Sequence, residues 1–293
     1  MTSAPQANYL LIDGALRADA LASLYALAEP VEIEPLYLGT RWTELKHLGP
    51  LLVAVADSST LIDETWQRAG QQADASLLYS QAPLRAVADH LRRFIAPADA
   101  QGNKGLLRLA DPLVARHWLG SYQDAQRDAV LGPIQAWHLP PTPHAWVLDA
   151  PPEWLTFTRS AASPTWMDEY ARFADAQMQA LDQAARWRFK ERLHQRLQHS
   201  HSQPLARIDN ARLSHWLDER VEEAQAWGLV SQRSLAIWVE YSLRWGEGFA
   251  QNLQSPYQRW LARTPSALKL APELHIQQMD SDCLHLTVNK DVQ

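Results

Sequence analysis

Three charged residues at predicted strand ends are the strongest candidates for chemistry in this chain. Asp13 follows the apolar run at residues 9–12, and Arg108 and Asp111 lie at the end of the run at residues 105–109. Charged side chains are rare at the end of a buried strand unless they are paired or functional. Two interpretations are open: Arg108 pairs with Asp13 or Asp111 and fixes the domain interior, or the carboxylates serve catalysis. We favour the ion pair, because no nucleophile or histidine stands at a recognisable spacing.

Three dipeptides near these positions have a purely structural explanation. Asp13-Gly14 is typical of a turn after a strand, since glycine permits a positive φ. Gly49-Pro50 is a turn signal that precedes the apolar run at residues 51–55. Asp111-Pro112 predicts the start of a helix, with Asp as the cap and Pro in the first turn. These patterns position a backbone and need no reaction.

Known catalytic and cofactor motifs are missing from the sequence. It contains no Gly-x-Ser-x-Gly turn, no Gly-x-x-x-x-Gly-Lys phosphate loop, no His-Glu-x-x-His and no Gly-x-Gly-x-x-Gly. His194, His199 and His201 gather near the end of a predicted helix, but their spacing is poor for zinc and no cysteine or acid completes the set. We therefore expect no metal, no cofactor and no catalytic residue.

The elements that must position these residues alternate between strands and helices in the first half of the chain. Helices are predicted after the first strand, from Thr60 to about Ala69, at residues 84–94 and after Pro112. This alternation predicts an α/β lobe with a largely buried sheet. The predicted strands are residues 9–12, 35–38, 51–55, 76–79 and 105–109.

The hydrophobic period changes after a proline-dense stretch at residues 139–143 and 150–152, where we place the boundary between domains at 1–145 and 146–293. Beyond it, apolar residues recur at helical spacing. One long helix is predicted from Ser163-Pro164 to about residue 197. Two others begin near Asp209 and at Ser231 and end at Gly228 and Gly246. Residues 275–288 hint at strand-like alternation. The second domain is predicted to be mainly α-helical.

Tryptophan is unusually frequent, with 13 residues against 5 phenylalanines. Tryptophans fill cores and also dominate binding hot spots. A small helical domain has limited room for so many indoles, so we predict that some contact a partner, in the manner of an amphipathic helix docked in a groove. The candidates are Trp187, Trp216, Trp227, Trp238 and Trp245.

Charge and cysteine content exclude several classes of protein. The net charge of −6 argues against nucleic acid as the main partner, because phosphate contacts call for a basic surface. The single cysteine, Cys283, cannot form an intramolecular disulfide. The first residues do not resemble a secretory signal, and no apolar run approaches the ~20 residues of a membrane span. We expect a cytoplasmic protein with no membrane partner.

An ordered series of short blocks resembles the effector-loading adaptors of bacterial type VI secretion, the Tap/Tec chaperone family. The series covers about residues 8–138, and its order carries more information than any single block. Departures from the family pattern include Leu109, Ala110 and Leu113 around the Asp-Pro pair. The blocks are Leu11-Ile12-Asp13-Gly14, Pro35-Leu36-Tyr37-Leu38-Gly39-Thr40, Leu48-Gly49-Pro50-Leu51-Leu52-Val53, His90-Leu91-Arg92-Arg93-Phe94, Leu107-Arg108-Leu109-Ala110-Asp111-Pro112 and Leu131-Gly132-Pro133-Ile134.

The resemblance implies a cytoplasmic adaptor without catalytic activity. Such a protein binds a cognate toxin effector before secretion and brings it to the VgrG spike, often with a PAAR-type tip. Its second, helical lobe would be the variable, partner-binding part. Two alternatives remain: an α/β hydrolase- or transferase-like enzyme with a helical cap and a site near Asp13, Arg108 and Asp111, or a structural subunit unrelated to secretion.

Overall fold

The computed structural model describes residues 4–27, 30–56, 59–68, 72–147, 153–162 and 164–288. The chain divides into two compact units, called here the first lobe (residues 1–143 and 149–185) and the second lobe (residues 144–148 and 186–293). The domain boundary between residues 145 and 146 stays a prediction.

A six-stranded sheet forms the centre of the first lobe, with strand order β2-β3-β1-β4-β5-β6 and every neighbouring pair antiparallel. The central strand β1 is fully buried, as its uninterrupted apolar sequence requires. The predicted α/β character of this lobe is confirmed. The strands are β1 (Tyr9–Asp13), β2 (Glu32–Pro35), β3 (Pro50–Ala54), β4 (Ala75–Tyr79), β5 (Ala136–Leu139) and β6 (Leu155–Thr158).

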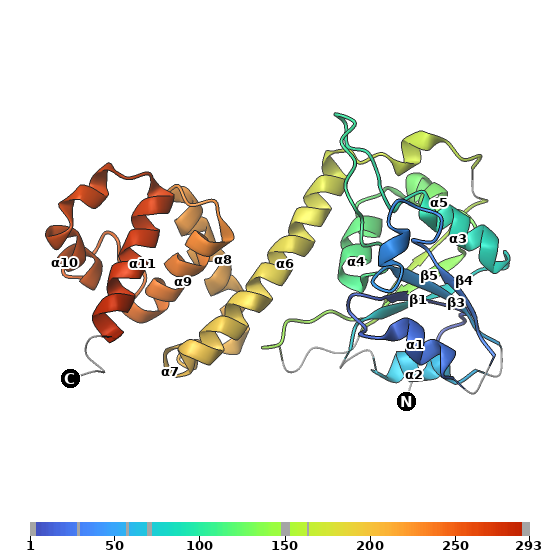
Figure 1. Ribbon diagram of the computed structural model, residues 1–293, viewed down its shortest axis with the longest axis horizontal. Helices are drawn as coiled ribbons and strands as arrows, with labels where there is room; N and C mark the ends of the chain where they lie inside the picture. Colours follow the sequence, from blue (N-terminus) through green and yellow to red (C-terminus); the bar gives the residue numbers. More distant parts are fainter. Residues whose placement is uncertain are drawn as a thin grey trace. The chain divides into compact units, whose positions relative to one another are not determined.

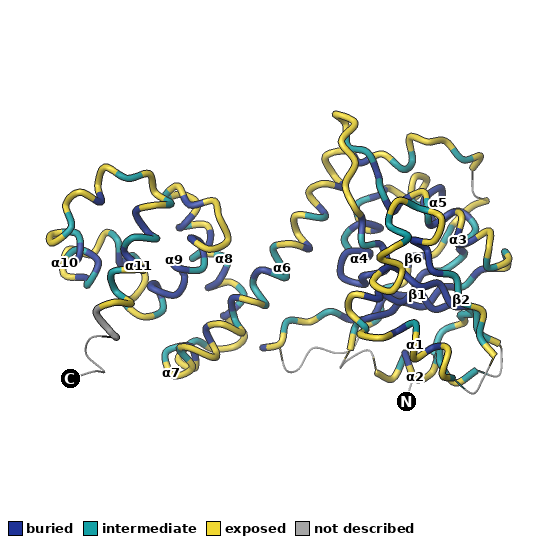
Figure 2. Tube along the Cα trace, in the orientation of Figure 1, coloured by how far each residue is buried: buried dark blue, intermediate teal, exposed yellow. Residues whose placement is uncertain are grey.

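Helices cover both faces of this sheet (Figure 1). On one face, Leu10 and Ile12 of β1 pack with Leu24 of α1 (Ala20–Tyr25), and α2 (Leu61–Arg68) closes the same cluster. On the other face, Trp137 of β5 packs against Trp118 of α4 (Pro112–Gly120). Helices α3 (Leu84–Arg92) and α5 (Asp124–Leu131) lie on that side too. Strands β1, β3, β4 and β5 are accordingly among the most buried segments, whereas the edge strands β2 and β6 are partly exposed (Figure 2).

Two predicted strands are corrected by the structure. Residues 105–109 form no strand: the Leu107 amide donates to the Ile95 carbonyl, and Leu107 and Leu109 are buried outside the sheet. A short apolar run satisfies a strand and a buried irregular segment equally well, so the pattern could not discriminate. The predicted strand at 35–38 is displaced, since β2 ends at Pro35 and a loop follows that turns at Gly39, whose φ is 76°.

The second lobe is built from helices, as predicted. Its core contains Leu217, Trp238, Tyr241, Phe249 and Met279, contributed by different helices and loops. The helices of this lobe are the second half of α6 (Asp175–Ser200), α7 (Ser202–Leu205), α8 (Asn210–Ala226), α9 (Gln232–Trp245), α10 (Pro256–Arg263) and α11 (Pro272–Val288), together with the short 3₁₀ turn η3 (Pro265–Lys269). The first lobe contains two further 3₁₀ turns, η1 (Thr43–Leu45) and η2 (Asp168–Ala171).

Local capping explains where several of these helices begin and end. Asp209 accepts a hydrogen bond from the Ala211 amide, and Ser231 accepts one from the Ser234 amide. Gly228 and Gly246 follow α8 and α9 with φ of 103° and 94°, a conformation that favours glycine at a helix end. The predicted starts near Asp209 and at Ser231 are therefore confirmed, as are both glycine ends.

One further expectation for this half of the chain is wrong. The long helix α6 begins at Asp175 and not at Ser163-Pro164, and Ser163 itself lies outside the described residues. The Phe173 amide is already used by the Ala98 carbonyl, and Gln177 Oε1 accepts from the Ala174 amide at the real start. Residues 275–288, where the alternation did not decide the type of element, are helical and belong to α11.

No helix within the described ranges is both long and apolar enough to cross a membrane.

Candidate functional site

The three charged residues singled out in the sequence meet at the end of β1. Arg108 Nη2 lies 2.9 Å from Asp13 Oδ1 and 3.3 Å from Asp111 Oδ2, and Arg108 Nε lies 3.3 Å from Asp13 Oδ2. Both aspartates are buried, at 4% and 1% exposure, while Arg108 is half-buried. The guanidinium lies between two buried carboxylates and compensates their negative charge, which would be costly to bury unpaired.

Both carboxylates also bind backbone amides. Asp13 Oδ1 accepts from the Ala15 amide at 2.9 Å and from the Leu16 amide at 3.1 Å, which closes the turn after β1. Asp111 Oδ1 accepts from the Leu113 amide at 3.1 Å and caps α4, whose first residue is Pro112. Carboxylates held in this way stabilise the turn and the helix start, and this geometry favours the structural interpretation over a catalytic one.

Close backbone approach explains the two glycines beside this network. The Gly14 amide donates to the Gly49 carbonyl at 3.2 Å, and Pro50 pairs with Asp13 in the register of β3 and β1. A Cβ added to Gly14 would lie 2.7 Å from the Gly49 carbonyl oxygen, and one added to Gly49 would lie 2.5 Å from the Tyr37 ring. Only glycine fits at either position without displacement.

Tyr37 connects the network to the loop at residues 36–49, called here the pinned loop. Its ring is buried against Gly49. Burial first, and then the negative charge of Asp13, raises the pKa of the Tyr37 phenol, while Arg108 lowers it. The phenol therefore stays neutral at physiological pH and acts as a packing group.

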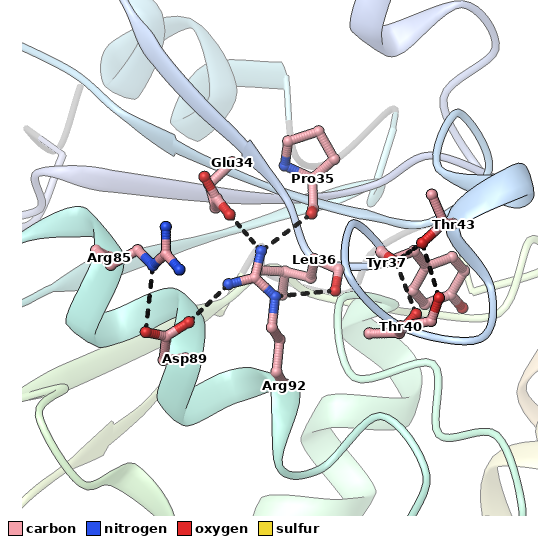
Figure 3. Close-up of polar contacts among 9 residues, drawn as sticks. All are labelled: Glu34, Pro35, Leu36, Tyr37, Thr40, Thr43, Arg85, Asp89 and Arg92. Carbon is pink, nitrogen blue, oxygen red and sulfur yellow. Dashed lines mark hydrogen bonds and ion pairs between the residues drawn. The ribbon is translucent and has the colours of Figure 1, made fainter.

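Hydrogen bonds within the pinned loop fix its shape (Figure 3). The Thr40 hydroxyl donates to the Tyr37 carbonyl at 2.7 Å, and the Thr43 hydroxyl donates to the Thr40 carbonyl at 2.7 Å. The Thr40 hydroxyl oxygen also accepts from the Trp42 amide at 3.1 Å, and the Arg41 guanidinium lies 4.2 Å from the Trp42 ring centroid. These local bonds replace a ladder of strand hydrogen bonds.

Arg92 of α3 holds the base of the loop (Figure 3). Its guanidinium pairs with Glu34, lies 2.8 Å from Asp89 Oδ1 and donates to the Leu36 carbonyl at 3.2 Å and the Pro35 carbonyl at 3.3 Å. Arg92 was not among the site residues predicted from the sequence. The available signal was its place in the block at residues 90–94, which resembles the adaptor family.

The pinned loop presents apolar side chains to solvent. Leu38, Leu45 and Leu48 are 45%, 46% and 47% exposed, and Leu16, on the adjoining turn after β1, is 43% exposed. Single exposed leucines are ordinary, but four on one ordered loop and its neighbouring turn are typical of an interaction surface. An arrangement of this kind can bind a protein.

The five tryptophans proposed as partner contacts are divided between the core and the surface of the second lobe. Trp238 is fully buried and Trp216 is 8% exposed, with its indole N–H donating to Glu247 Oε1 at 2.9 Å. Trp187, Trp227 and Trp245 are half-buried. These last three are the more exposed members of the set, and partner contact by any of the five stays a prediction.

Two of the three clustered histidines contact neighbours other than one another. His201 Nε2 lies 3.0 Å from Glu240 Oε1, and the His194 ring packs against Trp146 at 4.7 Å between centroids. Within the part of the chain that the structure describes, no three His, Cys, Asp or Glu side chains gather in a way that could hold a metal ion.

Part of the first lobe is similar to known proteins. Residues 8–129 match the model of a family described as "Domain of unknown function (DUF4123)". The chain is 31% identical over 104 residues to "Accessory protein VasW" of Vibrio cholerae serotype O1 (strain ATCC 39315 / El Tor Inaba N16961), a match over 35% of this chain. It spans about a third (34%) of the length of that curated relative. No solved structure matches the chain. All seven residues of the network and its turns, from Asp13 to Pro112, lie within the range that matches this family model.

Proposed function

We propose that this chain is a cytoplasmic adaptor of type VI secretion that binds a cognate toxin effector and brings it to the VgrG spike, with or without a PAAR-type tip. The observation that carries the proposal is the pinned loop: residues shared with the adaptor family hold it in one shape, and it exposes leucines. Rigid apolar loops bind proteins at low entropic cost, because little is ordered on association.

Two findings other than the geometry of the pinned loop support this function. The matched relative bears the printed name of an accessory protein, and the adaptor family that the sequence resembles shares the blocks that build the pinned loop and its ion network. The first lobe would supply the common docking surface. The second lobe, with half-buried Trp187, Trp227 and Trp245, would supply a surface particular to one effector.

The alternative, an enzyme with a site near Asp13, Arg108 and Asp111, has weaker support. A general base or nucleophile needs a carboxylate that can reach a substrate. Here both aspartates are buried, bind backbone amides and share one guanidinium. We therefore propose no catalytic step for this protein.

Co-purification of the tagged full chain with the products of the neighbouring genes tests the adaptor function. We expect a stoichiometric complex with a toxin-like or spike protein. Leu45→Asp combined with Leu48→Asp should weaken the complex at least tenfold, because two charges would be buried at the contact. Leu253→Asp is the matched control, since Leu253 is 85% exposed in the second lobe. A lone monomer that binds none of these products would contradict the proposal.

A further inference from the structure

An open pocket in the first lobe lies between α4 and the first part of α6. Its volume is about 350 Å³, and it is separate from the pinned loop. Polar groups dominate its lining, and none of them is acidic. The lining residues are Arg116, His117, Gly120 and Ser121 on the α4 side and Ala176, Gln179, Ala180 and Gln183 on the α6 side.

Arg116 differs from every other half-buried arginine of this lobe. Its Nε is buried without a hydrogen-bond partner, and no ion pair or ring contact of its guanidinium is found among the described residues. The others each have a partner: Arg17 pairs with Asp74, Arg92 with Glu34, Arg108 with Asp13 and Arg127 with Asp124, and Arg159 donates to the Gly132 carbonyl. Partly desolvating a cation without compensation costs free energy, so the exception needs an explanation.

The surroundings of Arg116 favour a negatively charged occupant. Helix α6 begins at Asp175, and Ala176 of its first turn lines the pocket, so the positive end of the helix dipole lies there. The Asp175 carboxylate belongs to the same turn but is not among the lining residues. His117 and the side-chain amides of Gln179 and Gln183 add possible hydrogen-bond donors. Burial is the largest influence on the His117 pKa and lowers it; the Gln183 hydrogen bond raises it, and the nearby charge of Arg116 lowers it.

We propose that this pocket binds a single carboxylate group, carried by an acidic side chain or the C-terminus of the partner protein, with Arg116 as its principal ligand. A guanidinium fork matches a carboxylate with two parallel hydrogen bonds. One fixed positive charge neutralises one carboxylate, whereas phosphate sites usually gather several cations or backbone amides. The identity of the carrier as a partner protein rests on the adaptor function; the carboxylate pocket itself does not.

The pocket is tested first without any partner, on the purified full chain. Acetate and inorganic phosphate are titrated at fixed ionic strength while the Arg116 Nε–H and His117 ring signals are followed by NMR. A saturable shift with acetate that disappears in Arg116→Gln is expected. No saturable shift, or an equal shift in Arg116→Gln, would overturn the pocket, and tighter binding of phosphate would overturn its assignment to carboxylates. Circular dichroism and thermal unfolding serve to check that Arg116→Gln is folded.

The second arm uses the complex obtained by co-purification. Arg116→Gln should weaken it at least tenfold, whereas Arg85→Gln, which removes an arginine that is 79% exposed and pairs with Asp89, should change it less than twofold. Acetate binding at Arg116 without any partner complex would support the pocket and count against the adaptor. A partner complex that forms equally well with Arg116→Gln would overturn the docking role of the pocket.

Discussion

The first lobe and the second lobe are specified in different ways. In the first, a few charged residues and glycines from distant parts of the chain meet at one point, where Arg108 joins Asp13 and Asp111 and Gly14 meets Gly49. In the second, aromatic rings are spread through the core, with Trp238 lying 5.2 Å from Trp227 and 4.8 Å from Phe249 between ring centroids. The charged network and the close glycines accept few substitutions. An aromatic core mainly requires that the total side-chain volume is kept.

The family match covers the lobe that holds the Arg108 network and the two close glycines. A close backbone approach or a three-way ion network fails when one residue changes, whereas an aromatic core accepts other large apolar residues if its volume is kept. The matched range, residues 8–129, lies entirely in the first lobe.

The largest effect is expected from Trp238→Ala in the second lobe. Trp238 is fully buried, and loss of a buried tryptophan costs about 4 kcal/mol of unfolding free energy. Urea unfolding of the chain alone measures this. Trp238→Phe is the control and should cost less than half as much, because the indole N–H has no hydrogen-bond partner among the described residues. If Trp238→Ala left the free chain unchanged, volume would not be what specifies this lobe.

Arg108→Met should destabilise the first lobe by about 3 kcal/mol, because it leaves two buried carboxylates without a counter-charge. Adding Asp111→Asn should restore part of that loss, since asparagine still caps α4 and carries no charge. Arg85→Met, at an exposed pair, should change unfolding by less than about 0.5 kcal/mol. Absence of any rescue in the double variant would contradict the shared-charge account.

Gly14→Ala should cost about 2 kcal/mol, because its Cβ would meet backbone atoms that cannot move freely. Gly105→Ala is the matched control: nothing lies within 4 Å of the added Cβ, so thermal unfolding should be nearly unchanged. Equal melting temperatures for the two variants would show that close backbone approach does not specify the end of β1.

The smallest effect is a pH dependence from His90 in the first lobe. Burial is the main cause that lowers its pKa to about 4, opposed by a hydrogen bond with the Val130 carbonyl. Between pH 6.5 and 4 the unfolded chain therefore binds more protons at this site than the native chain does, so stability falls as the pH falls. The loss at pH 5.5 is about 1 kcal/mol. Other histidines with lowered pKa, such as His144 and His275, add to the slope, so the measurement is the difference between the wild type and His90→Gln.

Glu273 supplies the contrasting titration in the second lobe. Burial raises its pKa, but hydrogen bonds from the Ser231 and Ser234 hydroxyls and two backbone amides outweigh this and lower the pKa to about 2. Because its pKa is lower in the native chain, this carboxylate stabilises the fold at any pH above its unfolded pKa of about 4.3. That stabilisation is lost as the pH falls toward 2. The His90 contribution should thus be lost in mild acid and the Glu273 contribution only in stronger acid, as urea unfolding of His90→Gln and Glu273→Gln across pH would show.

Local signals within four residues of one another were enough to predict much of the framework. Asp209 and Ser231 cap their own helices, Asp111 caps α4 with Pro112 behind it, and Gly228 ends α8. Such interactions depend on sequence neighbours, so a pattern of residue types determines them. The sequence also determined the change from an α/β lobe to a helical one, because the hydrophobic period changes.

Only the tertiary structure decided which distant residues meet. Arg108 and Asp13 are 95 positions apart, and no local pattern could choose between Asp13 and Asp111 as the partner of Arg108 or show that it binds both. The same holds for the buried position of Trp238, the half-buried position of Trp227 and the lack of a hydrogen-bond partner for Arg116 Nε among the described residues. Burial and charge compensation depend on what packs from other elements, and that information exists only once the chain has folded.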